Sequence, residues 1–225
     1  MFSEQHDPSR DESASTMDRR RFLQTGLAVT GASLFSQGMK VGSARATPRS
    51  DDVLIVYLTR TGNTKAVAEI IREEVGDTMV SVEPETPYPK NYEEIVSQVA
   101  RENGRGYVPP LKTKIENIGE YDAVFLGFPT WDMQLPPPMR SFLHEHDLSG
   151  TTVIPFNTNG GYGVGSSFRM VDEMCSESDV LDGFSTRGGL ERDGIYLAIE
   201  GERRKEVHDS VTTWLERIEI GAVVE

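Results

Sequence analysis

The sequence predicts an α/β protein with three layers, in which a five-stranded parallel sheet lies between two layers of helices. Two patterns predict this fold class. Short, continuously apolar runs rich in β-branched residues recur along the chain, as expected of strands buried on both faces of a parallel sheet. Amphipathic segments with apolar residues at helical spacing separate these runs. Strands that alternate with helices in this way form right-handed βαβ units.

The strand predictions follow from the apolar runs in chain order. The first run, "VLIVYL", is continuously apolar, and the last, "VLDGFST", is the weakest. The predicted strands cover residues 53–58, 78–82, 122–128, 151–156 and 180–186.

The helix predictions follow from apolar residues that recur three and four positions apart. The segment 83–120 is longer than a simple crossover needs and contains five prolines, so we interpret it as structural, with its helix covering one face of the sheet. The predicted helices lie at about 67–75, 92–100, 139–146, 168–175 and 203–219.

The first 46 residues have the pattern of an export signal. A basic cluster that includes Arg19 and Arg20 precedes a modest apolar stretch, and the small residues of Ala44-Arg45-Ala46 follow it. The cluster resembles a twin-arginine (Tat) motif, and the small residues resemble a signal-peptidase site. We therefore expect a signal peptide at 1–46 and a folded domain at 47–225, with no stable membrane insertion after cleavage. An uncleaved amphipathic or membrane anchor is the alternative, although the apolar stretch is short for a span of roughly 20 residues.

The charge of the chain limits its partners. Residues 1–46 hold six of the 23 Lys/Arg and five of the 36 Asp/Glu, which leaves 17 and 31 in the remainder and a net charge of about −14. Such a surface repels nucleic acid and anionic membranes, which are both recognised by clustered basic residues. It suits docking to a basic partner protein, and solubility or salt adaptation is the other explanation.

Cys175 is the only cysteine, so the chain forms no intramolecular disulfide, which is unusual for a small exported domain. The Tat route carries proteins already folded in the cytosol, often around a cofactor. We expect Cys175 to be a buried helix residue, with a reactive thiol as the alternative.

The seam between the first strand and first helix carries the most informative motif, "TRTGNT". Loops at the carboxyl ends of parallel strands share one crevice, where unpaired helix N–H groups favour anions. Gly62 permits a tight turn, the threonines supply hydroxyl groups and Asn63 can cap the helix. The motif is neither GxGxxG nor GxxxxGK[ST]. An ordinary capped turn is the alternative to a phosphate cradle formed by Thr59, Arg60, Thr61, Gly62, Asn63 and Thr64.

The motif resembles the phosphate-binding loop of the flavodoxin family, which binds flavin mononucleotide (FMN). "GFPTWDMQLPPPMRSFL" at 127–143 resembles the second flavin loop of that family, and "LSGTTVIPFNTNGGYG" at 148–163 resembles its fourth strand and following loop. The resemblance implies strand order 2-1-3-4-5 with FMN at the switch point between strands 1 and 3.

The two later loops are suited to a flat aromatic ring. Trp131 can stack on it, with Pro129, Thr130 and Asp132 forming the surrounding turn, although a core or lid position for Trp131 is the alternative. A carboxylate at Asp132 would lower the flavin potential by disfavouring added negative charge. In the third loop, Tyr162 is either a second aromatic wall or a surface residue. The predicted binding residues there are Thr158, Asn159, Gly160, Gly161 and Tyr162.

Other chemistry finds little support in the sequence. His144 and His146 suggest a metal site, but they flank one helix position without a third ligand motif, and no GxSxG elbow is present. We expect an FMN-binding electron-transfer protein that acts outside the cytoplasmic membrane and docks a basic redox partner. An FMN-dependent NAD(P)H or quinone reductase is the alternative, and a domain that has kept the fold without the cofactor is a third.

Overall fold

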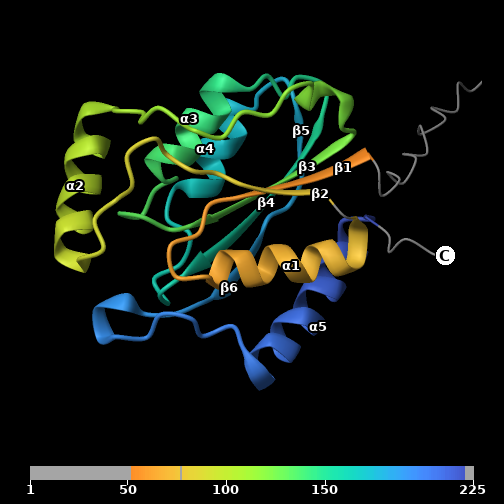
Figure 1. Ribbon diagram of the computed structural model, residues 1–225. Helices are drawn as coiled ribbons and strands as arrows, with labels where there is room; N and C mark the ends of the chain where they lie inside the picture. The colour runs from red at the N-terminus through yellow and green to blue at the C-terminus, as the bar shows by residue number, and fades with distance from the viewer. Residues whose placement is uncertain (1–51, 77, 221–225) are drawn as a thin grey trace, which may run out of the picture. The chain divides into compact units, whose positions relative to one another are not determined.

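The computed structural model describes residues 52–76 and 78–220, and the predicted signal peptide at 1–46 lies outside these residues. The described elements alternate between strands and helices along the chain, as predicted (Figure 1). The strands are β1 (Val53–Tyr57), β2 (Thr78–Ser81), β3 (Ala123–Pro129), β4 (Thr152–Asn159), β5 (Asp179–Val180) and β6 (Phe184–Arg187). The α-helices are α1 (Asn63–Val75), α2 (Tyr92–Arg105), α3 (Pro137–Glu145), α4 (Ser167–Met174) and α5 (Gly201–Arg217).

The sheet is parallel and has the order β2-β1-β3-β4-β5, which confirms the predicted topology. The fifth position differs in detail, because the predicted strand 180–186 is divided. Val153 of β4 pairs with Val180 of β5, whereas Phe156 pairs with Phe184 of β6. The break contains Gly183, where an added Cβ would lie 2.7 Å from the ring of Phe168 on α4. Close approach of this helix therefore accompanies the interruption between the two short strands.

Two apolar clusters cover opposite faces of the sheet. Alternate residues of β1 point to opposite sides, with Ile55 in one cluster and Leu54 in the other. Helices α1 and α5 cover the first face, and α3 and α4 cover the second (Figure 1). All five residues of β1 are buried, as expected of a central strand in a doubly covered sheet. This arrangement fixes the carboxyl ends of β1, β3 and β4 at one edge.

The segment 83–120 follows the prediction only in part. Leu111 and Ile118 belong to the cluster beneath α3 and α4, so this portion covers a face of the sheet as expected. Helix α2, however, does not cover a face of the sheet, because its buried residues Ile95 and Val99 belong to neither apolar cluster. They line a cavity at the carboxyl ends of the strands instead. Among the helices that the structure describes, none has the length and apolar content needed to span a membrane.

Candidate cofactor site at the carboxyl ends of the strands

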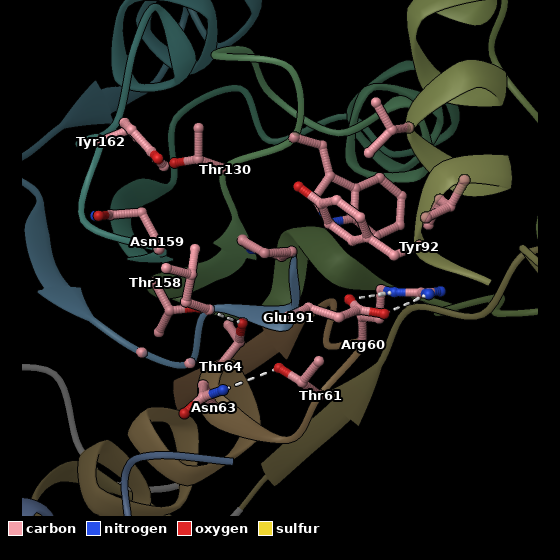
Figure 2. Close-up of a pocket in the computed structure, with 18 of the residues that line it drawn as sticks. Arg60, Thr61, Asn63, Thr64, Tyr92, Thr130, Thr158, Asn159, Tyr162 and Glu191 are labelled. Carbon is pink, nitrogen blue, oxygen red and sulfur yellow. Dashed lines mark hydrogen bonds and ion pairs between the residues drawn. The ribbon is translucent and has the colours of Figure 1, made fainter. Parts of the chain in front are cut away.

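A cavity of about 300 Å³ lies where β1, β3 and β4 end, and the three predicted loops meet around it (Figure 2). Its volume lies at the lower end of the range of ligand pockets. Of the predicted residues, Thr59, Gly62 and Gly161 support the loops without lining the cavity. The predicted residues that line it are Arg60, Thr61, Asn63, Thr64, Pro129, Thr130, Trp131, Asp132, Thr158, Asn159, Gly160 and Tyr162.

The first loop leaves backbone donors available for an anion. Gly62 has a left-handed backbone with φ of 88°, and its N–H donates to Thr59 Oγ1 at 3.1 Å. Helix α1 begins at the next residue. Within the described part of the chain, the backbone N–H groups of Thr61, Asn63 and Thr64 have no acceptor. Because these donors lie at a helix N-terminus beside the cavity, they suit a phosphate group.

Asn63 has a different role from the predicted cap, and that prediction was wrong. Gly62 occupies the cap position, and no side chain caps α1. The Asn63 side chain is 3% exposed and holds the segment before α5: its Nδ2 donates to Tyr196 O at 2.6 Å, and its Oδ1 accepts from the N–H groups of Ala198 and Ile199 at 2.9 and 3.2 Å. The same Nδ2 donates to Thr61 Oγ1 at 2.9 Å (Figure 2). The amide therefore joins the phosphate loop to the chain about 135 residues later.

Arg60 also joins distant segments. Its Nε and Nη2 donate to the carboxylate of Glu191, both at 2.7 Å, and the pair is largely buried (Figure 2). The guanidinium further donates to the carbonyls of Pro89 and Lys90 at 2.7 and 2.8 Å. Because Glu191 balances the charge of Arg60, the N–H and hydroxyl groups of the loop remain as the open anion donors.

The second and third loops are bonded to each other. Thr130 N–H donates to Thr158 O at 3.0 Å, and the fully buried Asn157 donates through Nδ2 to Thr130 Oγ1 at 3.0 Å. The hydroxyls of Thr64 and Thr158 lie 2.8 Å apart, which connects the first loop to the third. Trp131 lines the cavity and also packs against the core cluster beneath α3, so it has a core contact and is also placed to contact a ligand.

The third loop turns around Asn159. Its Oδ1 accepts from the N–H groups of Gly161 and Gly163 at 2.8 and 3.2 Å, which closes a glycine-rich turn. Tyr162 lines the cavity edge while remaining 65% exposed. It is thus both a lining residue and a surface residue, and its side chain interacts with Arg192.

Two walls of the cavity were not predicted from the sequence. On α2, Tyr92 and Val96 are 38% and 48% exposed beside the cavity, although their helical spacing is that of ordinary core residues. The turn after β6 supplies Gly189, where an added Cβ would lie 1.9 Å from the carbonyl oxygen of Tyr196. The Gly-Gly pair was a visible signal of close backbone approach. The missed lining residues are Tyr92, Ile95, Val96, Val99, Gly188, Gly189, Leu190 and Glu191.

The other candidates have structural surroundings. His146 is buried against the Phe142 ring, with its Nδ1 bonded to Phe142 O and its Nε2 accepting from Ile115 N–H. The described residues contain no cluster of three potential metal-ligating side chains. Cys175 is buried as predicted, and burial raises the pKa of its thiol to about 11.

Comparison of the sequence with known protein families gives a match to one family, and the match includes the sheet and the three loops. The profile described as flavodoxin matches residues 52–200, which cover the sheet, the phosphate loop and both later loops. The chain belongs to the flavodoxin family. FMN is the cofactor of flavodoxins, and it binds at the switch point where this cavity lies.

Individual relatives agree with this assignment. A flavodoxin from Nostoc sp. is 23% identical over 188 residues, covering 75% of this chain and 96% of its own. A flavoprotein structure from Bacteroides eggerthii is similar with a TM-score of 0.60 and 27% identity, covering 75% of this chain and 98% of its own. The fold also resembles a Lactobacillus acidophilus flavoprotein in complex with FMN, with a TM-score of 0.54, 20% identity and coverage of 62% and 93%.

Proposed function

We propose that this flavodoxin binds FMN at the described cavity and carries electrons to a basic partner protein outside the cytoplasmic membrane. One observation carries the proposal. The backbone N–H groups of Thr61, Asn63 and Thr64, which have no acceptor among the described residues, lie at or just before the start of α1 and border a cavity that Trp131 also lines. A ligand with a phosphate at one end and an aromatic ring at the other matches both walls.

The protein's own residues would bind and orient the cofactor. The N–H groups and hydroxyls of the first loop would hold the phosphate, while Trp131 and Tyr162 would contact the ring system. Bound FMN supplies the redox chemistry. The bonds among the three loops, such as Thr64 to Thr158, hold the donors in place before binding, which lowers the entropic cost of binding.

The charge distribution supports a basic partner. Glu93 and Glu94 occupy the first turn of α2 next to the cavity-lining Tyr92, and Asp132 is exposed at the cavity itself. Together with the strong net negative charge, these carboxylates favour weak, salt-sensitive encounters with a positively charged surface.

Location outside the cytoplasmic membrane is supported by the twin-arginine pattern around Arg19 and Arg20. Replacing both residues in an Arg19→Lys/Arg20→Lys variant and locating the protein by cell fractionation would test this location.

Calorimetry with FMN and riboflavin tests the cofactor assignment. Residues 47–225 should bind FMN at least about 100-fold more tightly than riboflavin, because a phosphate accepting several N–H bonds contributes more than about 2.7 kcal/mol. Thr64→Val removes one hydroxyl at the cradle and should weaken FMN binding while leaving riboflavin binding nearly unchanged. Thr113→Val, whose hydroxyl donates to Ser81 O outside the cavity, is the matched control. Equal affinity for the two ligands would refute the phosphate cradle.

Kinetics with two electron acceptors tests the carrier role. The reduced holoprotein should reduce cytochrome c, a basic acceptor, at a rate that falls steeply with ionic strength. It should oxidise NADH or NADPH only slowly. Fast NAD(P)H oxidation coupled to quinone reduction, with no salt dependence toward cytochrome c, would instead identify an FMN-dependent reductase.

A further inference from the structure

The turn after Trp131 holds an unusual backbone conformation. Asp132 and Met133 are consecutive non-glycine residues with φ of 52° and 56°. Left-handed conformations at such residues cost of order 1–3 kcal/mol each and persist only where the surroundings enforce them. Trp131 and Gln134 close the turn with backbone bonds of 3.0 and 3.3 Å. Because Trp131 and Asp132 line the cavity, the strain lies at the site itself.

Contacts from two sides hold this turn. The carbonyl of Met133 accepts from Ser166 N–H at 2.9 Å and from the Ser166 hydroxyl at 3.2 Å. On the other side, the Asp132 carboxylate accepts from Asn103 Nδ2 at 2.9 Å. Asn103 lies near the end of α2, the helix that lines the cavity and does not cover a face of the sheet as predicted. The conformation is therefore fixed by contacts beyond the turn.

Arg140 on α3 orients the Asn103 amide. Its Nη2 donates to Asn103 Oδ1 at 2.9 Å and to Tyr107 O at 3.3 Å, which leaves Asn103 Nδ2 directed at Asp132. Arg140 is 9% exposed, and its Nε has no hydrogen-bond partner among the described residues. Burial lowers the pKa of this guanidinium. Because a buried charge costs more than an apolar side chain of similar volume, stability alone does not account for arginine here.

The same turn of α2 also supports Trp131. Glu102, adjacent to Asn103, is buried and accepts from the Tyr88 hydroxyl at 2.5 Å. The Tyr88 ring packs edge-on against Trp131 with centroids 5.0 Å apart. Two neighbouring residues of α2 thus act on two neighbouring residues of the strained turn.

We propose that Asn103, oriented by Arg140, is a positioning residue that holds the Asp132 carboxylate at the cavity and thereby keeps the midpoint potential of bound FMN low. A fixed negative charge beside the ring disfavours the gain of further negative charge on reduction. Without Asn103 the turn would relax and the exposed carboxylate would move into water, where its field is weaker. This inference rests on the proposed FMN binding.

Potentiometric titration of the holoprotein tests the inference. Asn103→Ala and Asp132→Asn should each shift the midpoint potential upward. The double variant should shift it no further than the larger single effect, because both substitutions act through the same carboxylate. The ratio of the dissociation constants for reduced and oxidised FMN should fall at least about twofold in Asn103→Ala. Asn91→Ala removes the N-cap of the same helix, where Asn91 Oδ1 accepts from Glu94 N–H, and should leave the potential unchanged.

A second readout requires no cofactor. In the FMN-free protein, Asn103→Ala should accelerate hydrogen exchange at the amides of Trp131 and Gln134, whereas Asn91→Ala should not. An unchanged potential in Asn103→Ala at wild-type FMN affinity, additive shifts in the double variant, or unchanged exchange would each overturn the positioning role. If the wild-type chain does not bind FMN, the proposed function fails in the titration before any variant is compared.

Discussion

Asn63→Ala tests how the phosphate loop is held together. The substitution removes two bonds to backbone N–H groups, one bond to a backbone carbonyl and one bond to the Thr61 hydroxyl. The Thr61 hydroxyl lines the cavity and can bond to water instead. The three backbone groups lose a partner in a buried or half-buried position, since Ile199 is 2% exposed. At about 1 kcal/mol for each bond, the expected loss of unfolding free energy is about 3 kcal/mol.

Urea denaturation and thermal melting of the Asn63→Ala variant measure this loss. For a domain of this size, about 3 kcal/mol corresponds to a fall in Tm of roughly 6–12 °C. FMN binding should weaken about fivefold, because the loop loses its bond between Asn63 and Thr61. Asn91→Ala, which removes a single exposed capping bond, should cost only about 1 kcal/mol. An Asn63→Ala protein within about 0.5 kcal/mol of wild type would refute the argument that this amide clamps the site.

Three further substitutions probe close contacts and burial. Gly127→Ala places a Cβ 2.1 Å from the Phe156 ring in the centre of the sheet, and should cost about 2 kcal/mol or more in urea denaturation. Gly165→Ala combines a φ of +57° with a Cβ 2.1 Å from Met133 O, so it should displace the strained turn and weaken FMN binding measured by fluorescence titration. For Cys175, burial raises the pKa from 9.0 to about 11, so its contribution to stability is full below pH 9 and is lost as pH rises toward 11. In Cys175→Ala, the unfolding free energy should fall less between pH 9 and pH 11 than it does in the wild type. Identical pH profiles of unfolding free energy in the variant and the wild type would contradict a raised pKa at Cys175.

The layer structure was predictable because the pattern that specifies it is local. Continuous apolar runs such as residues 53–58 identify strands that are buried on both faces, and the structure buries every residue of β1. The three cavity loops were predictable for the same reason, since parallel topology places every strand's carboxyl end at one edge. The division of the fifth strand was not predictable from its own residues. It depends on which half of β4 is available for pairing and on the packing of Phe168 against Gly183.

The roles of particular side chains could not be predicted where the partners are distant in the chain. Asn63 fits a helix cap by its position in the motif, yet its amide bonds to residues 196–199. Arg60 fits a phosphate ligand by charge, yet it pairs with Glu191, 131 residues away. The type of a residue determines which hydrogen-bond donors its side chain has. The acceptors that lie close to those donors depend on how distant parts of the chain fold together.

These distant bonds give the site a physical property that its motif alone does not imply. Asn63 and Arg60 both connect the phosphate loop to the segment that follows β6, so the anion donors and residues 188–199 are held by one set of bonds. A ligand that pairs with the N–H groups of Asn63 and Thr64 binds the loop in its folded conformation, and it therefore also stabilises the bonds between the loop and the later segment. Binding at the cradle should therefore stabilise residues 188–199 even where they do not contact the ligand. The exposed apolar side chains of Ile195, Tyr196 and Leu197 lie within that segment, so we expect cofactor binding to be thermodynamically linked to this surface beside the site.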